Sequence, residues 1–171
     1  MTQKINHHLK QYLNVHKSNP HVRIKKNGLV AFNNDSKKYW SIQILNTQKR
    51  KKPSYMVDRY FQWLATESKN IISVSFKDKS YSLYVKFLKN PVLILTIQTS
   101  TDQKVVLHVT GGLLAKKKQK GTFSFSLSDD KQIVVALESF EPRLPWMIYR
   151  ITQAPIHEFV MKKFQIKTVG E

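Results

Sequence analysis

The sequence predicts an α+β protein with an antiparallel sheet of about seven strands and a long C-terminal helix. Six strand-like runs follow one another between residues 71 and 140, and mostly short turns join them, which favours antiparallel pairing of neighbours. One helical stripe precedes these runs and another follows them. The 171 residues allow one such domain over 39–171, preceded by a basic helical and extended segment over 1–38.

Residues 1–38 carry weak signals of structure. The apolar residues from Ile5 to Leu13 recur at helical spacing, which predicts a short amphipathic helix that ends before Pro20. Apolar residues between 22 and 32 predict one or two weak strands, followed by a turn at 33–36.

A strand and a helix follow. Trp40, Ile42 and Ile44 alternate with Tyr39, Ser41 and Gln43, the period of a strand with one buried face. We then expect a helix capped by Ser54, because the residues after it place one apolar stripe at helical spacing: Met56, Val57, Tyr60, Phe61 and Leu64.

The six later runs are the main part of the predicted sheet. They cover residues 71–76, 81–87, 92–98, 103–109, 121–127 and 132–140. Segment 92–98 is apolar on both faces, so we expect it at the centre of the sheet. Gly111 and Gly112 permit a bulge or bend. Alternation predicts a common core that includes Ile72, Val74, Leu83, Val85, Leu95, Leu107, Phe123, Phe125, Val135 and Leu137.

A long helix over about 145–165 ends the predicted fold. Pro145 suits its first turn, where a missing N–H has no cost. Tyr149, Val160 and Phe164 belong to its buried face. Pro155 deletes a backbone hydrogen bond in its middle, so we expect a bend there.

This order of elements, from about Trp40 to Phe164, resembles the START/SRPBCC helix-grip superfamily. The run from Phe140 to Tyr149, leading to His157 and Met161, is similar to the strand-to-helix passage of some small bacterial members. The resemblance implies that the antiparallel sheet is curved and wraps the long C-terminal helix, with an apolar cavity between the sheet and that helix. No functional residue is carried over from it, because the superfamily is defined by shape.

Polar contacts to a ligand in such a cavity are sought on the final helix. Arg150, Gln153 and His157 share one helical face by their spacing. If that face turns inward, it can orient a carboxylate or phosphate; if it turns outward, it is a solvated stripe. We take Tyr149, Arg150 and His157 as the candidate ligand contacts.

The charge is the one compositional outlier. The sequence has 29 Lys and Arg against 11 Asp and Glu, a net charge of +18, and residues 1–52 contain a single acid, Asp35. An anionic partner is implied, either a membrane surface or a nucleic acid, unless the charge only maintains solubility. We expect one electropositive face, formed by the N-terminal arm with Lys49, Arg50, Lys51, Lys52, Lys116, Lys117, Lys118 and Lys120.

Nucleic acid remains open as the partner. The basic run at 49–52 precedes a helix that carries Tyr55, Tyr60 and Trp63, and cations beside aromatic rings are typical of single-strand binding. These aromatic residues also fall on or beside the stripe that the core needs.

Several chemistries find no support in the sequence. The absence of cysteine excludes disulfides and thiolate zinc sites, and no Gly-x-Ser-x-Gly turn or phosphate loop occurs. The histidines and acids are scattered, so we predict neither a metal nor a cofactor. No apolar run is long enough for a signal or a membrane span, which favours a cytoplasmic protein, peripheral at a membrane if it meets one.

The combined expectation is a non-enzymatic protein that holds an apolar or amphipathic ligand between sheet and C-terminal helix, with a basic surface for an anionic partner. A nucleic-acid-binding accessory protein is the first alternative. A small enzyme of the same fold is the second, and it requires polar groups that converge inside the cavity.

Overall fold

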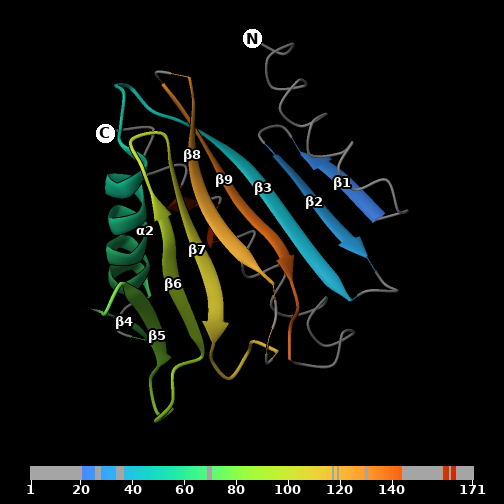
Figure 1. Cartoon of the computed structure of the whole chain (residues 1–171), viewed down its shortest axis with the longest axis vertical. Coiled ribbons are helices and arrows are strands. Elements are labelled where there is room, and N and C mark those ends of the chain that lie inside the picture. The colour runs from blue at the N-terminus through green and yellow to red at the C-terminus, as the bar shows by residue number, and fades with distance from the viewer. Residues whose placement is uncertain are drawn as a thin grey trace.

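The computed structural model describes residues 21–25, 28–33, 37–68, 71–116, 118, 120–129, 131–143, 160, 161, 163 and 164. They form one curved sheet of nine strands in the order β1-β2-β3-β9-β8-β7-β6-β5-β4, with helix α2 against it (Figure 1). The elements are β1 (His21–Lys25), β2 (Gly28–Asn33), β3 (Lys38–Asn46), α2 (Pro53–Glu67), β4 (Ile72–Lys77), β5 (Ser80–Val85), β6 (Leu93–Ser100), β7 (Lys104–Gly111), β8 (Thr122–Asp129) and β9 (Gln132–Phe140).

The pairing confirms the predicted antiparallel sheet. Every neighbouring pair of strands is antiparallel, and β3, α2 and the six strands β4 to β9 occur in the helix-grip-like order that the sequence predicts. The hairpin of β1 and β2 adds two strands beside β3, so the sheet has nine strands instead of about seven. The proposed division of the chain at residue 38 stays a prediction.

Helix α2 begins two residues earlier than the sequence suggests. Lys52 is the N-cap and Pro53 takes the first helical position, so Ser54 is not the cap. Proline is favoured there because its fixed φ fits the helix and its missing N–H would have had no intrahelical partner. At the other end, the Ser68 N–H donates to the Leu64 carbonyl.

The core lies between α2 and the inner face of the sheet, which is defined as the face that α2 covers. The apolar stripe of α2, centred on Tyr60 and Phe61, packs there against side chains of β4, β7 and β8. All ten predicted core residues of the strands belong to this cluster, six of them buried and four partly buried. The predicted alternation in β4 to β9 is therefore confirmed.

Two expectations about burial are wrong. Strand β3 is buried on both faces, because Tyr39 and Leu45 join the inner core while Ile42 and Ile44 are also buried on the outer face. Strand β6 is not central: β1 and β2 shift the middle of the sheet to β8. On β6 only Leu95 is fully buried, and the other apolar residues of the strand are partly buried.

The C-terminal part of the chain is described at Val160, Met161, Lys163 and Phe164, which have helical backbone. Phe164 is buried, and its ring centroid lies 5.2 Å from those of Tyr60 and Trp63. The predicted burial of Phe164 is confirmed. The long helix, its bend at Pro155 and its start at Pro145 lie outside the described residues and stay predictions.

Phe164→Ala is expected to lower the free energy of unfolding by about 3–5 kcal/mol, because it leaves a cavity beside two aromatic rings of α2. Phe87→Ala is the matched control, since Phe87 is almost fully exposed and should cost under about 0.5 kcal/mol. Urea unfolding followed by circular dichroism measures both. Equal losses for the two variants would contradict the described packing of Phe164.

Candidate functional site

An apolar tip stands at one end of the sheet, where loop 86–92 joins β5 to β6 and projects beyond its neighbours (Figure 1). Phe87 is 91% exposed and Leu88 is 48% exposed. Three backbone hydrogen bonds hold the base of the loop, from Lys86 N–H to the Ile71 carbonyl, from Leu88 N–H to the Val85 carbonyl and from Val92 N–H to the Leu83 carbonyl. Phe87 itself has a φ of 74°, which is uncommon for a bulky residue, so the loop holds its ring out of the core at a conformational cost.

Lysines flank the apolar tip. Lys86 and Lys89 are exposed on either side of it, and the Lys86 ammonium lies 5.3 Å from the centre of the Phe87 ring. A cation over an aromatic face is favourable by about 0.5–1 kcal/mol at an exposed site. The tip therefore combines large apolar surface with positive charge.

The β7–β8 loop is fastened beside the tip. Leu113 and Leu114 donate backbone hydrogen bonds to the carbonyls of Pro91 and Val92, each 3.0 Å long. Gly112 makes this approach possible: its φ is +111°, and a Cβ there would lie 2.4 Å from the Val92 oxygen. The predicted bend at the glycine pair is confirmed, and it adds the exposed side chain of Leu113 to the apolar tip.

The lysines of the β7–β8 loop extend the basic surface. Lys116, Lys118 and Lys120 are exposed, whereas Lys117 lies outside the described residues. The Lys116 ammonium pairs with the Glu141 carboxylate at 3.4 Å, and Lys38 approaches the same carboxylate at 3.8 Å. One carboxylate thus pairs with two ammonium groups, so this cluster keeps a net positive charge.

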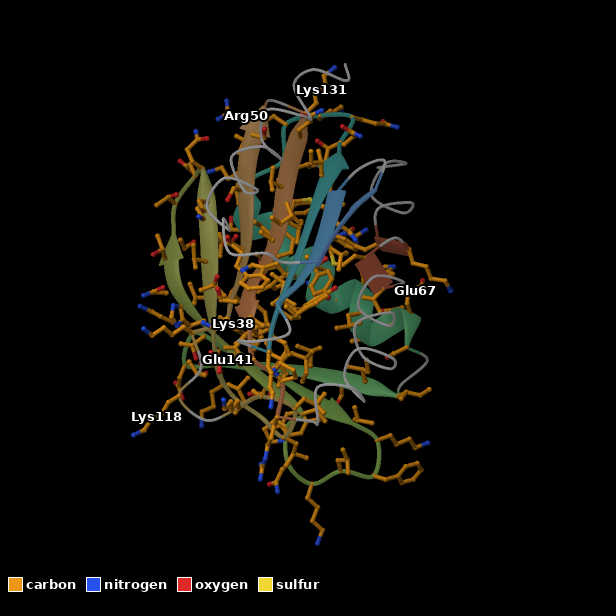
Figure 2. All side chains as sticks on the ribbon, turned by 90° about the vertical axis from the view of Figure 1, so that its right-hand side faces the viewer. Lys38, Arg50, Glu67, Lys118, Lys131 and Glu141 are labelled. Carbon is orange, nitrogen blue, oxygen red and sulfur yellow. The ribbon has the colours of Figure 1, made fainter. Side chains whose placement is uncertain are left out.

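The predicted single electropositive face is wrong, because the two basic clusters lie at opposite ends of the sheet. Strands β3 and β8 are both antiparallel to β9, so they run in the same direction. The run 49–52 follows the end of β3, and 116–120 precedes the start of β8. Figure 2 shows Arg50 near Lys131 at one end and Lys118 toward the other.

At the end that carries 49–52, cations and aromatics meet only in part. Lys49, Arg50 and Lys52 are exposed, Lys51 is half-buried with its ammonium 5.1 Å from the Tyr55 ring centre, and Lys52 pairs with Asp102. Tyr60 and Trp63 are buried in the core. Two of the three aromatics considered for base stacking are therefore unavailable to a nucleic acid.

An open groove of about 420 Å³ runs between α2 and the strand pair β4–β5. The Tyr81 hydroxyl donates a 2.5 Å hydrogen bond to Asp58 Oδ1 across it. Phe61 stacks on Tyr81 with ring centres 4.1 Å apart, and Phe76 lies 4.5 Å from Tyr81 on the open side. Sequence reasoning missed this groove because its residues come from three separate elements.

Polar atoms also lie inside the protein. Ser41 and Gln43 lie at every second position between Tyr39 and Leu45, so they share the inner face of β3 with these two core residues. Their buried oxygens and the Trp63 indole N–H have no hydrogen-bond partner among the described residues. The candidate ligand contacts Tyr149, Arg150 and His157 lie outside the described residues.

Two further searches give negative findings within the described residues. No described group of three or more His, Asp or Glu side chains is placed to hold a metal ion. No described helix has the length and apolar character needed to cross a membrane.

The groove gives the protein an alkaline sensitivity. Burial, the hydrogen bond to Asp58 and the Asp58 charge raise the pKa of Tyr81 above its ordinary value of 10.0. Because the folded pKa is raised, the stabilisation is complete below pH 10 and is lost as pH rises further. Between about pH 10 and 11 the wild type should lose stability more steeply than Tyr81→Phe, by up to about 1.4 kcal/mol per pH unit. Urea unfolding at several pH values measures this, and parallel losses would refute it.

Comparison with known proteins gives distant similarities. No protein-family model matches the sequence. Auxiliary protein GraX of Staphylococcus aureus (strain NCTC 8325 / PS 47) is 24% identical over 114 residues, which are 65% of this chain and 37% of GraX, so the chain matches little more than a third of that relative. Among solved structures, the human StarD13 (DLC2) lipid transfer and protein localization domain superimposes with a TM-score of 0.48 and 9% identity, over 95% of this chain and 94% of that domain.

Proposed function

We propose that this protein is a non-enzymatic ligand carrier that docks on an anionic membrane through its apolar tip. The ligand is an apolar or amphipathic molecule held between the sheet and the C-terminal helix. The tip comprises Phe87, Leu88 and Leu113, and the exposed lysines of the two adjoining loops surround it.

The exposure of Phe87 is the observation that carries the membrane part of this proposal. Phe87 is 91% exposed and has a positive φ, and both features cost free energy in water. Insertion into a bilayer interface recovers roughly 1.5–3 kcal/mol for the ring. Each lysine near an anionic leaflet adds about 1 kcal/mol. The sum supports reversible docking.

The two basic clusters contribute unequally in this proposal. Lys86, Lys89, Lys116, Lys118 and Lys120, together with Lys117 by sequence, approach the lipid headgroups when the tip inserts. The cluster Lys49, Arg50, Lys51 and Lys52 lies at the opposite end, so it adds only long-range attraction, which salt screens over about 8 Å at physiological ionic strength.

Buried polar atoms support the ligand part of the proposal. Ser41, Gln43 and Trp63 direct unpaired donors and acceptors toward the interior, and such groups are costly unless something satisfies them. A ligand with one polar group on an apolar body would do so. We propose that Tyr149, Arg150 and His157 add contacts from the C-terminal helix.

Nucleic acid binding has weaker support, because only Tyr55 of the considered aromatic residues is exposed. The enzyme alternative also has weak support. Ser41 and Gln43 on the inner face of β3 do not form a nucleophile–base pair, because a glutamine amide is not a base.

Vesicle sedimentation tests the docking surface. The double variant Phe87→Ser/Leu88→Ser should lose most binding to vesicles of phosphatidylcholine mixed with phosphatidylserine. Lys86→Glu/Lys89→Glu should weaken it by more than about tenfold, since two attractions become repulsions. The matched control Lys49→Glu/Arg50→Glu makes the same charge change at the opposite end and should have a much smaller effect.

The same variants separate the alternatives. Equal loss from the two charge-reversal pairs would show that net charge alone drives binding and would contradict the tip. Strong binding of single-stranded DNA or RNA that depends on Lys49 and Arg50 would favour the nucleic-acid alternative.

Native mass spectrometry of freshly purified protein tests the ligand. We expect a co-purified molecule of lipid-like mass that is lost on organic extraction, and a rise in apparent melting temperature when it is restored. Protein that carries no such molecule, and whose melting temperature no lipid raises, would contradict the carrier function.

A further inference from the structure

Strand β4 is an open edge of the sheet, and it lies beside the groove of α2 and β5. It is the last strand in the sheet order and pairs only with β5 among the described residues. Its register has no bulge, and it contains no proline. Bulges and prolines are two of the devices that block an edge from pairing with another chain, and β4 has neither.

The hydrogen-bond alternation identifies which backbone groups are open. The Lys86 N–H donates to the Ile71 carbonyl, so Ile71 directs its backbone groups toward β5. Because this direction alternates along an antiparallel strand, the N–H and C=O groups that face β5 are those of Ile71, Ser73, Ser75 and Lys77. The N–H and C=O groups of the intervening residues therefore point to the free edge. Those of Ile72 are satisfied there by the Ser68 side chain.

Val74 and Phe76 have no such partner in the described part of the chain. Their N–H and C=O groups form four adjacent hydrogen-bonding groups along the edge. Phe76 is 57% exposed and Val74 is partly buried, and both side chains line the groove. The edge therefore offers backbone pairing and a side-chain recess together, the two requirements for recognition by strand addition.

The opposite wall of the groove determines what side chains would fit. Helix α2 presents Asp58, Gln62, Ala65 and Thr66 along one stripe at helical spacing. Asp58 belongs to the end near Phe76, because it bonds Tyr81, the register partner of Phe76. Among the residues that the structure describes, Asp58 is the single charged one that lines the groove.

We propose that β4 binds an extended segment of a partner protein as an added antiparallel strand. Its residue opposite Val74 is apolar and enters the recess beside Ala65. Its residue opposite Phe76 is a lysine or arginine that reaches the Asp58 carboxylate. Its residue between them faces the outer side, where Lys77 favours an acid. Along the partner segment from its N-terminus, the predicted order of these three residues is therefore basic, acidic and apolar. The β4 surface that binds it is separate from the apolar tip.

The probe is the blocked peptide Thr-Thr-Lys-Glu-Val-Thr, titrated into the full-length ¹⁵N-labelled protein. We expect amide shifts centred on Val74, Phe76 and Asp58. The composition-matched peptide Thr-Thr-Glu-Lys-Val-Thr exchanges the two charges and should bind at least about fivefold more weakly. Methylating the Lys and Val amide nitrogens removes two of the pairing donors and should abolish the shifts.

Protein variants separate the two components of recognition. Val74→Pro removes an edge-facing N–H and spares the groups that bond β5, so binding should fall while the fold persists. Asp58→Asn should weaken binding of the Lys-Glu-Val peptide, so that the peptides with the two charge orders bind with nearly equal affinity. If Val74→Pro does not fold, the methylated peptide tests the same contact on the wild type.

Three results would overturn the proposal. The first is equal binding of the two charge orders, and the second is undiminished binding of the methylated peptide. The third is concentration-dependent shifts at Val74 and Phe76 without peptide, together with a dimer in light scattering, which would assign the edge to a second copy of this chain.

Discussion

The ring of Tyr60 is the contact on which the arrangement of the described core depends. Its centroid lies within 5.2–6.4 Å of the rings of five residues from α2, β8 and the C-terminal segment: Phe61, Trp63, Phe123, Phe125 and Phe164. Aromatic pairs at such distances add roughly 0.5–1.5 kcal/mol each beyond area burial. Because burial also raises the Tyr60 pKa, the phenol stays neutral in the core. The contact fixes α2 against the sheet, and the groove beside β4 follows from that position.

Antiparallel order then decides where charge can act. Each loop lies at the end of the sheet set by the direction of its strands, so basic runs that are similar in sequence are separated in space. The end of the sheet with loops 86–92 and 112–121 carries both the apolar tip and exposed lysines. The opposite end, with residues 49–52, carries positive charge without a comparable exposed apolar surface. The difference between the two ends, more than the net charge of +18, directs our proposal toward one docking surface.

Much of the fold was predictable from the sequence because its signals are local. Alternation located β4 to β9 and their shared core, and the stripe around Tyr60 located α2. The N-cap at Lys52 was missed because a serine next to the helix start is a stronger statistical signal than a proline at its first turn. The double burial of β3 could not be predicted, since period-2 alternation does not reveal what covers the second face.

The candidate sites were less predictable because they depend on contacts between distant residues. Asp58 and Tyr81 are 23 positions apart, and neither belongs to a motif. Alternation places Phe87 in the predicted strand 81–87, but β5 ends at Val85 and Phe87 lies exposed in the tight loop that follows. The open groups on Val74 and Phe76 require the strand order, which sequence periodicity does not contain.

Docking through the apolar tip is the central claim, and a single attached fluorophore tests it most directly. The chain has no cysteine, so Leu88→Cys and Lys49→Cys each accept one environment-sensitive label at a known end of the sheet. With phosphatidylserine vesicles, the label at 88 should shift to the blue and be quenched by nitroxide lipids, while the label at 49 stays aqueous. A label at 88 that stays aqueous on vesicle-bound protein, or a label at 49 that inserts instead, would contradict the account.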